Sequence, residues 1–446
     1  METFDKSLIY YFVGIKGTGM SALALVLDGE GYQVQGSDVA TYFFTQQELD
    51  RRQIPIYEFS ADNLKEGMFV IAGNAFPDNH PEIQQARELG LPLMRYHDFL
   101  GKLIENYTSI AITGSHGKTS TTGLMAHILS KLAPTSYLIG DGTGSGDEAA
   151  TYFALEACEY RRHFLAYVPD YAIITNVDFD HPDYYQSIQD VFEAIQTFAH
   201  QAKKAIIACG EDDYLRQLEA EVPVHYYGFA TDNEVYAANI ERTTEGSSFD
   251  VYIHGEKFGR FDSPVYGKHN ILNVLAVITV AYLEGFPADK IAEELASYGG
   301  VKRRFSTREL NQLTLIDDYA HHPSEIKATI DAAHQKYPDR EIIAVFQPHT
   351  FSRTVALLNE FANALSVADQ VYLVDIFTSA REKEGDISIE DLANLVVGGA
   401  EIISKDYLTP LMDYQDAVIL FMGAGDIDKL SLQFEQVYSQ QVANKF

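Results

Sequence analysis

Short apolar runs alternate with helical patterns along the first part of the chain. Runs rich in β-branched and aromatic residues at 8–13, 33–36 and 68–72 predict strands. Segments at 21–27 and 82–89 follow two of these runs and have the periodicity of helices. This alternation predicts a βαβ arrangement with a parallel sheet.

The same alternation occurs twice more. Its second occurrence has strand-like runs at 109–112, 172–175 and 205–208, and one helical pattern at 121–131. Its third begins near residue 299 and has four strand-like runs with helices between them, at 313–316, 342–346, 370–374 and 417–422. We therefore predict an α/β protein of three domains, at 1–105, 106–298 and 299–446.

Length and composition agree with this division. At roughly 100 to 200 residues per domain, 446 residues correspond to about three domains. Hydrophobic residues make up 46% and charged residues 22% of the chain, which is typical of a folded globular protein. The 64 acidic and 33 basic side chains give a net charge of -31, which disfavours nucleic acid and membrane surfaces as partners.

The cysteines and the apolar runs indicate the compartment. Cys158 and Cys209 are too few for a disulfide framework and lack the spacing of a zinc or redox motif. The N-terminus has no basic region typical of a signal peptide, and no apolar run approaches the roughly 20 residues of a membrane span. We expect a cytoplasmic protein.

A glycine-rich turn follows the first predicted strand and precedes the first helix. It reads Gly-Ile-Lys-Gly-Thr-Gly at 14–19, and such a turn allows a phosphate to approach backbone N–H groups at a helix N-terminus. Lys16 stands where the dinucleotide fingerprint has its middle glycine, which disfavours a nicotinamide cofactor and hence a dehydrogenase. Asp38 follows the second strand, where a carboxylate could bind a ribose hydroxyl. The alternative is a tight turn without a ligand.

A stronger motif lies at 113–120, which reads Thr-Gly-Ser-His-Gly-Lys-Thr-Ser between a buried strand and a helix. In this context backbone amides and a lysine bind a triphosphate while a hydroxyl binds magnesium. Lys118 is predicted to face the β- and γ-phosphates, and Thr119 the metal. The other predicted nucleotide contacts in this loop are Gly114, Ser115, Gly117 and Ser120.

Glu156 and His181 each follow an apolar, strand-like run. Ligands of open α/β sheets bind at the carboxyl ends of the strands, so these two residues could complete a second magnesium site. The alternative for each is a solvated loop residue.

Basic and histidine side chains gather beyond residue 299, in a chain with few positive charges. Arg304 and Asp318 are candidates for closing on a nucleotide, and His321, His349 and Arg353 for binding a carboxylate-bearing substrate. An imidazole is also the side chain best suited to accept a proton near neutrality.

Together, these motifs resemble those of the Mur ligases, the ATP-dependent amino-acid ligases of bacterial cell-wall synthesis, over essentially the whole chain. The resemblance rests on the turn at 14–19, the loop at 114–122, Tyr-Gly-Lys-His-Asn-Ile-Leu-Asn at 266–273, Asp-Asp-Tyr-Ala-His-His-Pro at 317–323 and Gln-Pro-His-Thr-Phe-Ser-Arg-Thr at 347–354. It implies an enzyme of peptidoglycan precursor synthesis that uses ATP and Mg²⁺. It also implies a Rossmann-like first domain for the UDP-sugar, a central domain that binds ATP through a P-loop, and a Rossmann-like third domain that closes on the nucleotide and the amino acid. Within the family, the first motif is most similar to that of members joining L-alanine to the lactyl carboxylate of UDP-N-acetylmuramate through an acyl phosphate.

The resemblance also implies roles for individual residues. The UDP-sugar would be bound by the N-terminal turn, at Gly14, Gly17, Thr18 and Gly19. Adenine would lie near His269, Asn270 and Asn273, with Arg304 and Asp318 joining from the third domain. Lys118 would act on the phosphates, and His321, His349 and Arg353 would surround the amino acid. Thr350 stands where many members carry arginine, so one guanidinium would bind the amino-acid carboxylate.

Two other functions fit the motifs. A related ligase could join a different amino acid or a peptide to a carboxylate, and a product assay would distinguish it. A non-catalytic ATP-binding module would use nucleotide only to drive domain closure, and it would not need the histidines and Arg353 of the third domain.

Overall fold

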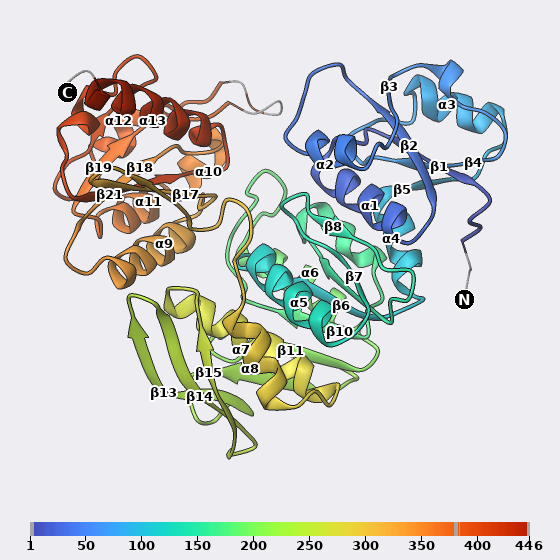
Figure 1. Cartoon of the computed structure of the whole chain (residues 1–446), viewed down its shortest axis with the longest axis horizontal. Helices are drawn as coiled ribbons and strands as arrows, with labels where there is room; N and C mark the ends of the chain where they lie inside the picture. The colour runs from blue at the N-terminus through green and yellow to red at the C-terminus, as the bar shows by residue number, and fades with distance from the viewer. Residues whose placement is uncertain (1–3, 379–381, 383, 444–446) are drawn as a thin grey trace.

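The chain folds into three units, each built around its own sheet, in a computed structural model that describes residues 4–378, 382 and 384–443 (Figure 1). The N-terminal unit, blue in Figure 1, and the C-terminal unit, orange to red, lie at opposite sides of the central unit. The α/β class with parallel sheets is as predicted. The domain boundaries near residues 106 and 299 stay predictions.

The N-terminal sheet has five parallel strands in the order β3-β2-β1-β4-β5. Its strands are β1 (Ile9–Val13), β2 (Gln33–Asp38), β3 (Ile56–Glu58), β4 (Met68–Ala72) and β5 (Leu93–Arg95). Its helices are α1 (Thr18–Gly29), α2 (Gln46–Arg51), α3 (Pro81–Glu88) and α4 (Tyr96–Ile104). β1 and β4 are buried along almost their whole length because helices cover both faces of the sheet, which is why they are apolar runs in the sequence.

The central unit is built on a ten-stranded sheet in the order β15-β14-β13-β12-β11-β10-β6-β9-β7-β8. Its strands are β6 (Thr108–Thr113), β7 (Thr135–Leu138), β8 (Gly144–Ser145), β9 (Tyr152–Glu156), β10 (Tyr171–Ile174), β11 (Ala205–Cys209), β12 (Val224–Gly228), β13 (Val235–Thr243), β14 (Gly246–Ile253) and β15 (Glu256–Ser263). Its helices are α5 (Lys118–Leu132), α6 (Ile188–Ala199), α7 (Lys268–Leu283) and α8 (Ala288–Ala296).

The antiparallel extension β13-β14-β15 was not predicted from the sequence. The central part of β13 is exposed, so its sequence lacks the apolar run that identifies a buried parallel strand.

The C-terminal sheet has the order β16-β17-β21-β18-β19-β20, and only β16 is antiparallel to its neighbour. Its strands are β16 (Ser306–Leu310), β17 (Leu313–Asp318), β18 (Glu341–Phe346), β19 (Gln370–Leu373), β20 (Glu401–Ile402) and β21 (Ala417–Met422). Its helices are α9 (Pro323–Lys336), α10 (Phe351–Ala356), α11 (Leu358–Leu365), α12 (Ile389–Ala393) and α13 (Ile427–Ala443). Two hydrophobic clusters cover its two faces.

The N-terminal and central units pack through a glycine-rich loop that precedes and includes β8. A Cβ atom on Gly144 would lie 2.0 Å from the carbonyl oxygen of Ala22, and one on Gly146 would lie 2.0 Å from that of Val26. Only glycine therefore allows this loop to approach the backbone of α1 so closely. In the part of the chain that the structure describes, no helix is long and apolar enough to cross a membrane.

Candidate active site

A cavity of about 570 Å³ lies between the central and C-terminal units. The phosphate-binding loop and the start of α7 line it from the central unit, and the segment around β17 and one face along α9 line it from the C-terminal unit. The strands β6, β9 and β10 end beside it, at the edge where open α/β sheets bind ligands.

The loop from Gly114 to Gly117 connects β6 to α5 as predicted. Both glycines have positive φ, 124° and 81°, which leaves the backbone free to turn into the helix. Lys118 donates to the carbonyl oxygens of Gly114, at 2.6 Å, and Ser115, at 3.0 Å, and its ammonium lies 2.9 Å from the Glu159 carboxylate. Burial disfavours the charged lysine, but the Glu159 carboxylate together with Cys158 and Glu156 outweighs it and raises the pKa of Lys118. The lysine is thus a fixed positive charge at the helix N-terminus.

The predicted metal residues lie around this lysine. Glu156, at the end of β9, accepts a hydrogen bond of 3.0 Å from the backbone N–H of Gly140, and the nearby Thr119 hydroxyl favours its charged form. Burial raises the pKa of Glu156, although Lys118 opposes this shift. His181 lies with its Nε2 atom 3.6 Å from Glu159, a residue that sequence reasoning did not select. Cys158, Glu159 and His181 form a group whose ligand atoms lie within 4.8 Å of one another.

The start of α7 and the C-terminal unit form the rest of the cavity wall. His269, Asn270 and Asn273 line it together with Arg304 and Asp318, as the resemblance implied for a nucleotide site.

Local contacts fix both the residues at the start of α7 and Asp318 of the C-terminal unit. The Asn273 amide donates to the Asn270 side chain at 3.0 Å, and burial lowers the pKa of His269 to about 4. Asp318 accepts hydrogen bonds of 2.8 Å from the backbone N–H groups of Phe305 and Ala320, so its carboxylate is held by the loops of its own unit.

Aromatic rings and one lysine lie at the same wall. The Tyr266 and Phe305 rings are tilted against each other with centroids 5.6 Å apart, and the Lys336 ammonium lies 4.9 Å from the first centroid and 5.9 Å from the second. Burial lowers the pKa of Lys336. The rings come from two different units and meet only because the units dock.

Arg353 contacts the central unit directly. Its Nε atom donates to Asp180 at 2.8 Å, and both side chains are buried. His181 Nε2 lies 3.8 Å from the same carboxylate. Arg353, which was predicted to bind the amino acid, and His181, which was predicted to bind the metal, therefore both lie beside Asp180. Burial disfavours the Asp180 carboxylate, but Arg353 together with nearby histidines overcomes this and holds the pKa of Asp180 well below its usual range.

The two histidines predicted beside the amino acid lie in the C-terminal unit. His321 Nδ1 is 3.0 Å from Glu325, and the His349 ring stacks on Phe377 with a centroid distance of 5.5 Å. The residue after His349, Thr350, has a φ of 72°, and His181 has a φ of 55°. Positive φ is costly for both residue types and is typical of functional sites.

The N-terminal turn lies away from the cavity, in the first unit. Gly14 has a φ of 85° and contacts the Phe76 ring so closely that a Cβ atom would overlap it. Lys16 is buried and donates to the carbonyl oxygens of Val39 and Thr41, at 2.8 and 3.0 Å. Asp38 accepts from the backbone N–H groups of Lys16 and Val39, both at 2.8 Å. Lys16 and Asp38 therefore hold the turn, and ribose binding by Asp38 stays a prediction.

Sequence reasoning missed several charged residues that surround the predicted ones. They are His116, Glu159, Asp178, Asp180 and Glu325. Each lies within a few residues of a selected position, on the same loop or helix turn. Proximity to a selected residue was the available signal, but it does not tell which neighbours point inward.

The chain is similar in sequence to known ligases. Family models describe residues 9–108 as "Mur ligase family, catalytic domain", residues 112–281 as "Mur ligase middle domain" and residues 303–425 as "Mur ligase, glutamate ligase domain". It is 58% identical to a UDP-N-acetylmuramate–L-alanine ligase of Levilactobacillus brevis over 98% of both chains. It is also 58% identical to the ligase of the same name from Lactiplantibacillus plantarum, over 98% of this chain and 100% of that one.

Solved structures share the architecture. The crystal structure of UDP-N-acetylmuramate-alanine ligase from Thermotoga maritima superimposes with a TM-score of 0.80 at 26% identity, over 97% of this chain and 100% of the other. A murein peptide ligase from Psychrobacter arcticus has the same fold, with a TM-score of 0.69 at 22% identity over 97% and 98% of the two chains. Sequence, motifs and fold agree over nearly the full length, and the chain therefore belongs to the Mur ligase family.

Proposed function

We propose that this chain is an ATP-dependent ligase that joins L-alanine to the lactyl carboxylate of UDP-N-acetylmuramate, in peptidoglycan precursor synthesis. The observation that carries the proposal is the 58% identity over 98% of the chain to two ligases of that name. The phosphate-binding loop beside a cavity between two units supports the use of a nucleotide.

The chemistry explains why a phosphate-binding loop and an amino-acid site belong together. A carboxylate is a poor acyl donor, so transfer of the γ-phosphoryl group of ATP to it creates an acyl phosphate with a good leaving group. The neutral amino group of the amino acid then attacks the acyl carbon, forming the amide and releasing phosphate. Fixed positive charge near the transferred group stabilises the transition state.

Lys118 is the residue we assign to the phosphates. Its ammonium is charged, is held by Glu159 and lies at the N-terminus of α5, where the backbone N–H groups also favour an anion. His269, Asn270, Asn273 and Arg304 are assigned to the nucleotide because they line the same cavity.

Thr119, Glu156 and His181 are assigned to magnesium. A hydroxyl and a carboxylate that contact each other at the end of β9 are oxygen donors suited to Mg²⁺, and Lys118 lies near enough to lower the pKa of Glu156. His181 lies one residue from Asp180, on the loop that closes this side of the site. When bound, Mg²⁺ would neutralise phosphate charge.

His321, His349 and Arg353 are assigned to the amino acid. In this structure Arg353 is paired with Asp180, and its Nη1 atom donates to the carbonyl oxygen of His349 at 3.2 Å. The guanidinium therefore has a defined position beside both His349 and the loop of His181. Either imidazole could orient the amine or accept its proton.

Mass spectrometry of a reaction mixture tests the function. Purified protein is incubated with ATP, Mg²⁺, UDP-N-acetylmuramate and L-alanine, and parallel mixtures offer glycine, L-serine or a stem tripeptide. We expect the alanyl product, with ADP and phosphate formed only when both co-substrates are present. A product from the tripeptide but none from L-alanine would instead identify a peptide ligase, and ATP hydrolysis that is independent of the sugar would support a module without ligase activity.

A further inference from the structure

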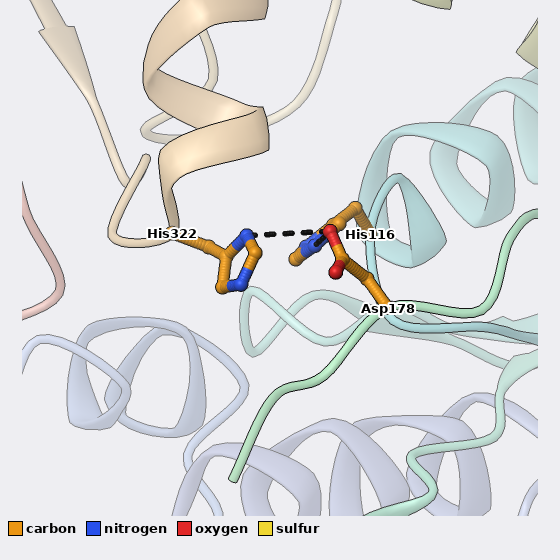
Figure 2. A group of neighbouring side chains, drawn as sticks. All are labelled: His116, Asp178 and His322. Carbon is orange, nitrogen blue, oxygen red and sulfur yellow. Dashed lines mark hydrogen bonds and ion pairs between the residues drawn. The ribbon is translucent and has the colours of Figure 1, made fainter. Parts of the chain in front are cut away.

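Three side chains from two units converge beside the cavity (Figure 2). His116 belongs to the phosphate-binding loop and Asp178 to the loop after β10, both in the central unit, whereas His322 is the N-cap residue of α9 in the C-terminal unit. Their ligand atoms lie within 4.8 Å of one another. None of the three is among the residues assigned above to substrate, nucleotide or magnesium.

The spacing of the three groups is that of metal ligands. His116 Nε2 lies 3.1 Å from Asp178 Oδ2, and His322 Nδ1 lies 3.6 Å from the same oxygen. In a tetrahedral zinc site with bonds of about 2.0 to 2.1 Å, neighbouring ligand atoms are about 3.4 Å apart. Figure 2 shows both rings turned toward the carboxylate, so little movement would bring the three atoms around one ion.

The outer nitrogen of each ring faces an oxygen, which lies within hydrogen-bond distance for His322 but not for His116. His116 Nδ1 lies 3.6 Å from Glu325 Oε1, and His322 Nε2 lies 3.3 Å from the carbonyl oxygen of Phe179. A carboxylate or carbonyl behind the imidazole is the usual environment of a metal-binding histidine, because it fixes the ring and increases the basicity of the inner nitrogen.

The surroundings favour a positive charge. The carboxylates of Asp178 and Glu325 lie 3.1 and 3.6 Å from the two ring nitrogens of His116. A cation would take the place of two hydrogen bonds, from the Ser324 hydroxyl to Asp178 at 2.7 Å and from the Ser324 backbone N–H to His322 at 3.3 Å.

We propose that His116, Asp178 and His322 form a binding site for a divalent transition-metal ion of the zinc class. Two imidazoles and a carboxylate are a ligand set that such ions favour over Mg²⁺, which prefers oxygen. Because the ligands come from both units, the ion links the C-terminal unit to the phosphate-binding loop and holds the cavity closed. The proposal goes beyond the ligase function and does not depend on it.

Metal titration of the full-length protein tests this site. Metal-free protein is kept in excess Mg²⁺, without substrates, and titrated with Co²⁺ while the visible absorption is recorded, and with Zn²⁺ in a calorimeter. We expect one equivalent to bind, with the intense visible bands of four-coordinate Co²⁺. His322→Asn should weaken binding by about tenfold or more, because it removes one ligand.

The variants are chosen so that folding and location are both controlled. Asparagine is a good N-cap residue, so its side chain in His322→Asn can still accept a hydrogen bond from the backbone N–H of Ser324. The unfolding temperature of the protein should therefore stay unchanged. If His322→Asn lowers the unfolding temperature, Asp178→Asn is used in its place. Cys158→Ser alters the other metal-like group, at Cys158, Glu159 and His181, and should leave binding unchanged.

Three results would overturn the proposal. In the first, the wild-type protein binds neither Co²⁺ nor Zn²⁺ in excess Mg²⁺. In the second, both His322→Asn and Asp178→Asn bind the ion with full affinity. In the third, the protein shows a cobalt–thiolate absorption band that disappears in Cys158→Ser. The last result would place the ion at Cys158 instead.

Discussion

At the scale of single residues, charges around the cavity are buried in pairs. Lys118 and Glu159 lie 2.9 Å apart, and Arg353 and Asp180 lie 2.8 Å apart. Moving a charge out of water costs several kcal/mol, and the partner offsets that cost only while it is present. Removing one member therefore affects stability as well as chemistry.

Replacement of Lys118 by alanine should lower both activity and stability. Loss of one preorganised charge at the transferred phosphoryl group should reduce kcat by about 10²- to 10³-fold. Leaving Glu159 buried and unpaired should lower the free energy of unfolding by about 3 to 5 kcal/mol. Steady-state kinetics and denaturant unfolding measure the two effects.

The double variant Lys118→Ala/Glu159→Gln separates the two effects. It removes the unpaired charge, so most of the stability should return while kcat stays low. If the double variant recovered activity together with stability, Lys118 would have only a structural role.

His269 should make stability depend on pH. Burial lowers its folded-state pKa to about 4, below the unfolded value of about 6.5, so the unfolded chain binds the proton more tightly. Its contribution to stability is complete above pH 6.5 and falls as the pH decreases toward 4. At pH 5 the loss should be about 2 kcal/mol.

Urea unfolding of the wild type and of His269→Gln at pH 7 and pH 5 measures this contribution. Other groups titrate in the same range, so the quantity to compare is the difference between the two proteins. On going from pH 7 to pH 5, we expect the free energy of unfolding to decrease more for the wild type than for His269→Gln. An equal difference at both pH values would contradict the assignment of a depressed pKa to His269.

At the scale of elements, glycine positions determine how closely segments pack. The loop that contains β8 lies against α1 because Gly144 and Gly146 have no side chain between the two backbones. Phosphate-binding loops use glycine differently, since Gly114 and Gly117 are needed for their positive φ. The first role depends on a partner that is distant in sequence, and the second is local.

Gly144→Ala should weaken the packing between the N-terminal and central units. Its Cβ atom would lie 2.0 Å from a backbone oxygen of α1, so the loop has to move, at a cost of about 1 to 3 kcal/mol. Gly299→Ala is the matched control, because its Cβ atom would meet nothing within 4 Å. Thermal unfolding should show a lower Tm for the first variant only, and equal Tm values would refute the close approach.

At the scale of the whole molecule, closure of the C-terminal unit completes the cavity. α9 is held against the β13–β14 hairpin by Gln335, whose Oε1 atom accepts from Arg242 and from the backbone N–H of Gly267, both at 2.8 Å. Its Nε2 atom donates to the carbonyl oxygen of Gly246, at 2.8 Å, and to that of Thr243, at 3.1 Å. Gln335 thus joins α9 to the central unit through both of its polar atoms, beside an ion pair of 2.7 Å between Arg242 and Asp331.

Gln335→Ala should favour the open arrangement and weaken nucleotide binding. Net values of about 0.5 to 1.5 kcal/mol per hydrogen bond suggest a loss of about 1 to 2 kcal/mol, or roughly 5- to 30-fold in KM for ATP. Lys327→Ala, an exposed change on the same helix, is the control and should leave KM unchanged. Equal KM values for the two variants would show that the amide does not control closure.

The sequence alone determined the fold class, the main parallel strands and the phosphate-binding loop. These features are local: a buried parallel strand has to be apolar along its length, and a strand–glycine–helix turn is read within a few residues. The loop from Gly114 to Lys118 could therefore be assigned from its own residues and their neighbours. The antiparallel β13–β15 extension could not, because β13 and β15 are partly exposed and leave a weak pattern.

Only the tertiary structure decided which side chains meet. Lys118 pairs with Glu159, 41 positions away, and Arg353 with Asp180, 173 positions away. Such pairings depend on how loops turn and how units dock, and no periodicity in the chain records them. The same holds for His116, Asp178 and His322, which come within ligand distance only because α9 packs against the phosphate-binding loop.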